Sequence, residues 1–115
     1  MIDNKFIKIY YHHDDNLVFV EFKENCTIQI YEKSIFPIIE LFKKNSAEKL
    51  ILQDLTGDVF MDTTQIWIKD FIRELIHTSC EKIELVIKKD YPHKDEVEVF
   101  QALFDDFFPI KISKI

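Results

Sequence analysis

Glycine, cysteine and proline are scarce in this chain, which has one, two and three of them among its 115 residues. A single glycine excludes a glycine-rich phosphate-binding loop and a nucleophile elbow, because each needs glycine at several fixed positions. Cys26 and Cys80 are too far apart in sequence for a Cys-x-x-Cys motif and too few for a zinc site. We therefore expect no enzyme, no catalytic residue, no cofactor and no metal ion.

Long hydrophobic runs are also missing from the sequence. No apolar segment approaches the roughly 20 residues that a transmembrane helix needs, and the chain does not open with a signal-peptide pattern. We therefore expect a protein that is not transmembrane, that is cytoplasmic, and whose two cysteines are reduced.

Acidic residues outnumber basic ones by 21 to 15, which gives a formal net charge of −6. Such a chain repels a phosphate backbone, so we expect no nucleic-acid partner. Hydrophobic residues make up 47% of the sequence, and its length suits one domain over residues 1–115. Eleven phenylalanines predict a dense aromatic core.

Two segments near the start alternate apolar and polar residues, at 6–10 and 17–22. This pattern predicts a β-hairpin whose turn holds His12-His13-Asp14-Asp15-Asn16. Adjacent strand residues point to opposite faces, so His12 and His13 are poorly placed to share a metal ion. We interpret this polar cluster as a solvated turn.

Residues 27–44 carry apolar side chains at helical spacing, with Thr27 as a candidate N-cap. Pro37 falls inside this segment and removes a backbone hydrogen bond. Because the helical spacing extends over the whole of 27–44, we favour a kinked or two-part helix there. The alternative is a shorter helix capped by Ser34, with Pro37 in its first turn. Either helix should end at Asn45-Ser46.

Strands and helices alternate through the rest of the chain. We expect strands at 49–53, 83–88 and 110–115, and helices at 63–77 and 95–107. Asp95 and Glu98 suggest a capping box, and Leu50-Ile51-Leu52 suggests a strand buried on both faces. The predicted fold class is α/β, with a mixed, mostly parallel sheet, an N-terminal hairpin and helices packed on it.

The loop between the expected strand at 49–53 and the expected helix at 63–77 carries the most distinctive residues. Asp62 can cap the helix, and Gln65 three residues later completes a capping box. Thr63 and Thr64 then fall in the first helical turn. Helix capping alone explains this pattern. The carboxylates of Asp54, Asp58 and Asp62 suit a divalent cation, but their spacing matches no known binding loop.

The same loop resembles that of the STAS domains, the family of the anti-sigma-factor antagonists. The matching residues are Asp54-Leu55-Thr56-Gly57 followed by Val59-Phe60-Met61-Asp62-Thr63-Thr64. The segment after the loop, from Gln65 to Ile76, is more similar to small STAS/SEC14-like proteins. Gln65 stands where the family has glycine, and threonine replaces its serine.

The resemblance implies a non-enzymatic regulatory module that binds a protein partner and is switched by phosphorylation. It implies Thr63, and next to it Thr64, as phosphoacceptor, and an interaction loop made by Asp54, Thr56, Gly57, Asp58 and Asp62. STAS domains carry one more helix after the last strand. We therefore expect that strand to be partly uncovered, which favours a partner or a homodimer.

An alternative follows from the STAS/SEC14-like side of the resemblance, which implies a small apolar-ligand or lipid-binding domain. Phe60, Met61, Trp67 and the phenylalanines of the last helix could line an apolar pocket. A densely packed aromatic core explains the same residues, since a chain of this length has little room for a cavity.

Overall fold

The computed structural model describes residues 1–57 and 65–115. These residues form strands and helices in the following order: β1 (Ile2–Asp3), β2 (Ile7–His12), β3 (Leu17–Phe22), α1 (Ile28–Asn45), β4 (Lys49–Asp54), α2 (Gln65–Leu75), β5 (Lys82–Ile87), α3 (Lys94–Phe104) and β6 (Ile110–Lys114). The hairpin and the alternation of strands and helices confirm the predicted order. The two-residue strand β1 was not predicted.

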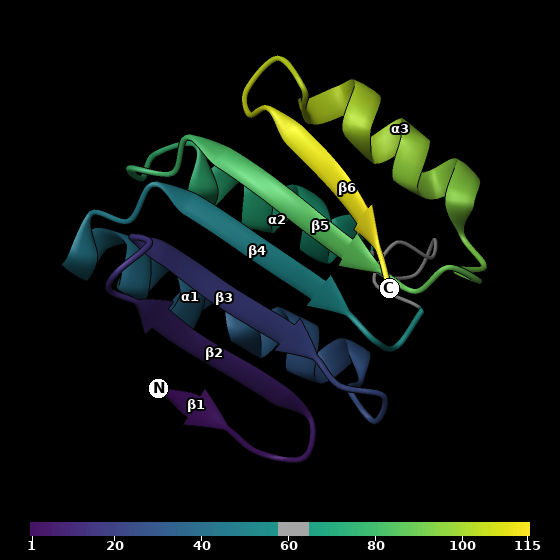
Figure 1. Cartoon of the computed structure of the whole chain (residues 1–115), viewed down its shortest axis with the longest axis horizontal. Helices are drawn as coiled ribbons and strands as arrows, with labels where there is room; N and C mark the ends of the chain where they lie inside the picture. Colours follow the sequence, from purple (N-terminus) through teal and green to yellow (C-terminus); the bar gives the residue numbers. More distant parts are fainter. Residues whose placement is uncertain (58–64) are drawn as a thin grey trace.

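The six strands form one sheet in the order β1-β2-β3-β4-β5-β6 (Figure 1). β1, β2 and β3 pair antiparallel, whereas the pairs from β3 to β6 are parallel. The structure is therefore α/β with a mixed, mostly parallel sheet and an N-terminal hairpin, as predicted. Leu52 and Leu85 are register partners on β4 and β5, and both are buried.

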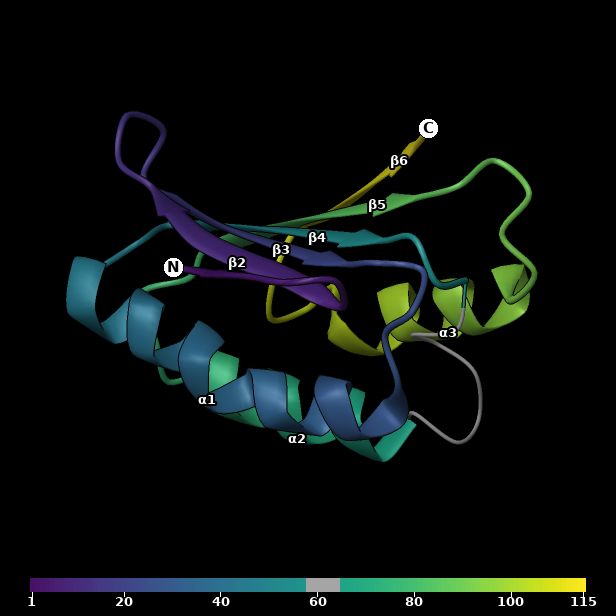
Figure 2. The same cartoon turned by 90° about the horizontal axis from the view of Figure 1, so that it is seen from below.

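All three helices lie on the same side of the sheet (Figure 2). The core forms between this helix layer and the sheet, and Val18, Val20 and Phe22 face it from β3 with no exposed surface. Within the described residues, no helix is long and apolar enough to cross a membrane.

The prediction that β4 is buried on both faces is wrong. Leu50 and Leu52 are buried, but Ile51 between them is only half-buried. Strand side chains alternate between faces, and the described helices cover one face only, so Ile51 lies on the helix-free side.

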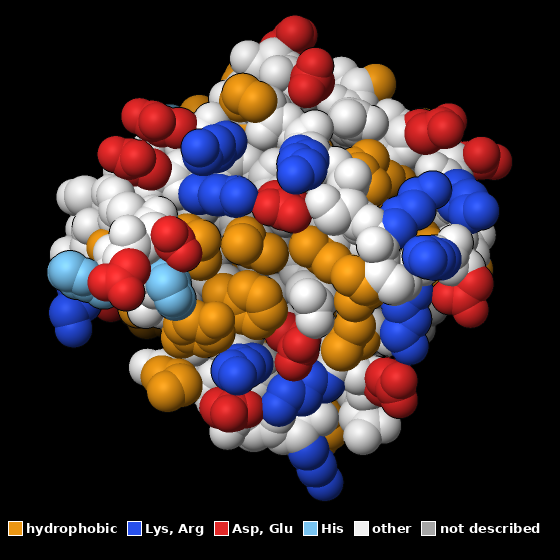
Figure 3. Space-filling view, viewed as in Figure 1, with side chains coloured by type: hydrophobic (Ala, Val, Ile, Leu, Met, Phe, Trp, Pro, Cys, Tyr) orange, Lys and Arg blue, Asp and Glu red, His pale blue; other side chains and the backbone are white. Residues whose placement is uncertain are grey.

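The helix-free face has an apolar centre with charged side chains around it (Figure 3). Tyr10, Phe19 and Ile51 are register partners across β2, β3 and β4, and the rings of Tyr10 and Phe19 lie 5.2 Å apart. On the same face, Lys49 forms an ion pair of 2.9 Å with Glu84 and thereby lowers the pKa of that carboxyl.

Helix α1 runs from Ile28 to Asn45 as one helix with Pro37 inside it, not as two parts. Thr27 occupies the N-cap position, as predicted, but its side chain makes no capping hydrogen bond. Ser46 ends the helix in a left-handed conformation with φ of 50°. The Ser34-capped alternative is therefore excluded.

Helices α2 and α3 are present as predicted, but they end at Leu75 and Phe104, before the predicted ends at 77 and 107. In α2, the helical spacing of the apolar residues predicts Trp67 at the edge of the buried stripe. Trp67 is instead 2% exposed and stacks on Phe71, so it belongs to the core. Helix α3 begins at Lys94 with His93 as its N-cap, so Asp95 lies in the first turn and caps nothing. The helical spacing of the apolar residues in α3 predicts that Val99 is buried. Val99 is instead 56% exposed, and the buried side of the helix contains Val97 and Phe100.

Candidate functional site

The predicted interaction loop begins where β4 ends, at Asp54. This end of β4 lies beside the end of β5, because Asp54 is the register partner of Ile87. The carboxyl ends of neighbouring parallel strands therefore meet at this edge, which is where α/β proteins usually place their binding groups.

Asp54 is fully buried and accepts hydrogen bonds on both carboxylate oxygens. Oδ1 accepts from the Thr56 backbone N–H at 3.0 Å and from the Thr56 hydroxyl at 2.6 Å. Oδ2 accepts from the Tyr91 hydroxyl at 3.1 Å. The carboxylate thus fixes the first turn of the loop to the connection that follows β5.

Helix α1 joins the same network through Tyr31, whose hydroxyl lies 2.6 Å from the Thr56 hydroxyl. The single proton of the Thr56 hydroxyl is donated to Asp54, so Tyr31 is the donor in this pair. The Tyr31 ring is buried against Phe22 and Trp67, with centroid distances of 4.7 and 5.5 Å. We call Tyr31, Asp54, Thr56 and Tyr91 the Asp54 network.

The chain's one glycine also lies at this site. Gly57 is buried and has φ of +78°. This is a left-handed backbone conformation that residues other than glycine rarely adopt. A Cβ atom placed there would lie 3.4 Å from Cδ of Pro92. Gly57 therefore lets the loop turn sharply while it lies close to the connection after β5.

A shallow pocket of about 250 Å³ opens beside this turn. Thr56, Gly57 and Tyr91 line it together with the charged residues Lys88 and Asp90. Lys88 is also 3.2 Å from Glu24, which follows β3. The pocket is too small for a drug-sized ligand.

Four of the predicted site residues lie outside the described part of the chain. These are Asp58, Asp62 and the two phosphoacceptor candidates Thr63 and Thr64. The predicted cap at Asp62 and the pocket residues Phe60 and Met61 lie outside it as well. The structure therefore brings together Asp54, Thr56 and Gly57 of the predicted loop.

Sequence reasoning missed Tyr31 and Tyr91 as members of the site. From the sequence, Tyr31 is one of several apolar positions at helical spacing in residues 27–44, and Tyr91 stands next to Pro92 in a turn. A buried tyrosine needs a partner for its hydroxyl, so a tyrosine in the apolar stripe of α1 was a usable signal. The partner itself is 25 residues away in sequence and could not be identified from spacing.

The two cysteines are free thiols with little nucleophilic character. Burial and the negative charge of Asp54 raise the pKa of Cys26 to about 12. Burial likewise raises the pKa of Cys80 to about 12. At neutral pH both remain protonated, and only the thiolate is a good nucleophile or metal ligand.

The Asp54 network is suited to hold a loop in place rather than to catalyse a reaction. Asp54 has no exposed surface and both of its oxygens are occupied, so it cannot reach a substrate. Among the described residues, no group of three or more His, Cys, Asp or Glu side chains is arranged to hold a metal ion.

Comparison with known proteins assigns no family to this chain, because no family model, curated protein or solved structure matches it.

Proposed function

We propose that this chain is a non-enzymatic, STAS-like regulatory module whose loop between β4 and α2 binds a protein partner. The observation that carries the proposal is the Asp54 network. It fixes the first residues of the loop to α1 on one side and to the connection after β5 on the other. A binding loop held at its base loses less conformational freedom when it docks.

The local charges support switching by phosphorylation at Thr63 or Thr64. A phosphate adds a charge of about −1.5 to −2 at neutral pH. In the sequence it would stand beside Asp62 and near Asp58, in a chain whose net charge is already −6. Phosphorylation should therefore disrupt a docked interface rather than strengthen it.

No described contact favours the apolar-ligand alternative. Trp67, which would have to line the pocket, packs against Phe22, Tyr31 and Phe71. The cytoplasmic location and the homodimer remain predictions.

The proposal is tested with three tagged variants of the full chain. Thr63→Glu mimics the phosphate, Thr63→Val removes the hydroxyl, and Ala102→Glu adds the same charge at an exposed position of α3. Proteins captured from the native cytosol are quantified by mass spectrometry, and circular dichroism checks that each variant is folded.

We expect wild type, Thr63→Val and Ala102→Glu to capture the same partner and Thr63→Glu to lose it. A phosphate on Thr63 or Thr64 in chain recovered from its source would support the switch directly. Equal capture by Thr63→Glu and wild type would show that the loop is not the docking edge.

A further inference from the structure

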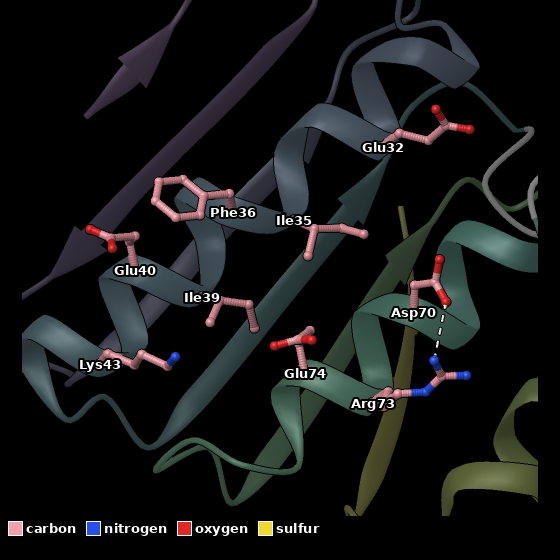
Figure 4. A pocket seen from close by; sticks show the side chains of 9 residues that line it. All are labelled: Glu32, Ile35, Phe36, Ile39, Glu40, Lys43, Asp70, Arg73 and Glu74. Atoms are coloured by element: carbon pink, nitrogen blue, oxygen red, sulfur yellow. Dashed lines mark ion pairs between the residues drawn. The ribbon is translucent and has the colours of Figure 1, made fainter.

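A groove runs between helices α1 and α2 on the outer surface of the helix layer (Figure 4). It encloses about 600 Å³ and is separate from the Asp54 network. Ile35 and Ile39 point from α1 toward α2 and form its apolar floor. Phe36 lies at its rim on α1 and is 72% exposed, which is unusual for so large an apolar side chain.

Acidic side chains border this apolar floor. Four carboxylates and two cations line the groove, which leaves a local net charge of −2: Glu32, Glu40, Asp70 and Glu74 against Lys43 and Arg73. The Arg73 guanidinium lies 3.8 Å from Asp70, so part of the positive charge is already compensated. The groove thus combines an apolar floor with excess negative charge.

From this geometry we propose that the groove binds a basic amphipathic helix of a partner protein. The stripe from Glu32 to Lys43 spans about 17 Å of α1, at about 1.5 Å per residue, which suits roughly three turns of a third helix. Apolar residues on one side of that helix would cover Ile35, Phe36 and Ile39. Lysine or arginine residues on its flanks would meet the carboxylates.

Charge favours this groove over the helix-free face as the docking site. On the helix-free face, the strands carry four lysines and three acidic residues, so its local charge is opposite in sign to that of the whole chain: Lys8, Lys49, Lys82 and Lys111 against Asp3, Glu21 and Glu84. In the groove the local charge and the chain's net charge of −6 have the same sign. A basic segment is therefore attracted both at long range and at contact.

The test uses a fluorescent synthetic peptide of about 12 residues, with leucine at helical spacing and lysine on the flanks. Its binding to the full chain is measured by anisotropy. Phe36→Ala removes the exposed anchor, and Phe107→Ala removes a phenylalanine that is 56% exposed outside the groove. Glu40→Lys and the matched control Glu98→Lys change the charge equally, inside and outside the groove.

We expect Phe36→Ala to raise the dissociation constant about tenfold or more, whereas Phe107→Ala changes it less than about twofold. Glu40→Lys should weaken binding clearly more than Glu98→Lys and reduce its salt dependence. A peptide with glutamate in place of lysine should not bind. Thr63→Glu should bind like wild type, which separates this proposal from the loop proposal.

Four outcomes would overturn the inference. The first is no binding of the lysine peptide, and the second is equal binding of the glutamate peptide. The third is equal weakening by Glu40→Lys and Glu98→Lys, which would indicate unspecific charge attraction. The fourth is a dimer of the chain alone that Phe36→Ala dissociates, because a second copy would then occupy the groove.

Discussion

At the scale of single residues, the Asp54 network explains why the loop begins with Asp54, Thr56 and Gly57. Asp54 provides two buried acceptor oxygens, and Thr56 provides both a backbone and a hydroxyl donor. Gly57 supplies the left-handed turn that follows. Three residues within four positions thus have separate physical requirements, none of which needs a bound ligand.

We predict that Asp54→Ala destabilises the protein by about 2–4 kcal/mol. The substitution removes the acceptor for Thr56 and for the Tyr91 hydroxyl, and buried donors without their partner are costly. The free energy of unfolding in urea measures the effect.

Tyr91→Phe is the matched control, because it removes one hydrogen bond and leaves the carboxylate in place. It should cost about 1 kcal/mol. If Asp54→Ala were no more costly than Tyr91→Phe, the network would not hold the base of the loop.

At the scale of elements, alternation and helical spacing were enough to predict the hairpin, the strands β4 and β5, and the helices α1, α2 and α3. They could not predict β1, because two residues carry no period and the strand exists only through its pairing with β2. The prediction of which side of α3 is buried was also wrong at Val99. The sequence of α3 contains apolar residues on two neighbouring stripes, and packing against the sheet selected Val97 over Val99.

Helix α1 shows how tertiary contacts override a local rule. Pro37 removes the hydrogen bond that its position would donate, yet α1 continues through it. Tyr31, Ile38 and Phe42 are at most 1% exposed, so their burial holds both halves of the helix on the sheet. The missing hydrogen bond at Pro37 therefore lowers the stability of the folded protein but does not break the helix.

We predict that Pro37→Ala stabilises the protein by about 1–3 kcal/mol, because alanine restores the missing donor and is the best helix former. Pro37 is only half-buried and lines a surface hollow with Ile2 and Ile9, so few ring contacts are lost. Urea denaturation measures the change. A decrease in stability would mean that the proline ring packs more favourably on β2 than the lost hydrogen bond costs.

At the scale of the whole molecule, the described structure has two layers, and the sequence alone did not reveal this. Alternation shows which strand residues share a face, but not which faces the helices cover. The run Leu50-Ile51-Leu52 looked buried on both sides, yet Ile51 lies on the helix-free face. The site, too, could be predicted only in part. Its loop residues were identified from the sequence, whereas the two tyrosines that bind them were not.

The two-layer arrangement predicts unequal costs for truncating side chains on opposite faces of the sheet. Leu85 is 1% exposed and faces the helix layer, so Leu85→Ala should cost about 2–5 kcal/mol. Ile51 is half-buried on the helix-free face, so Ile51→Ala should cost about 1 kcal/mol. Both are measured by urea denaturation at two protein concentrations. If Ile51→Ala cost as much as Leu85→Ala and the midpoint rose with concentration, a second copy would cover the helix-free face.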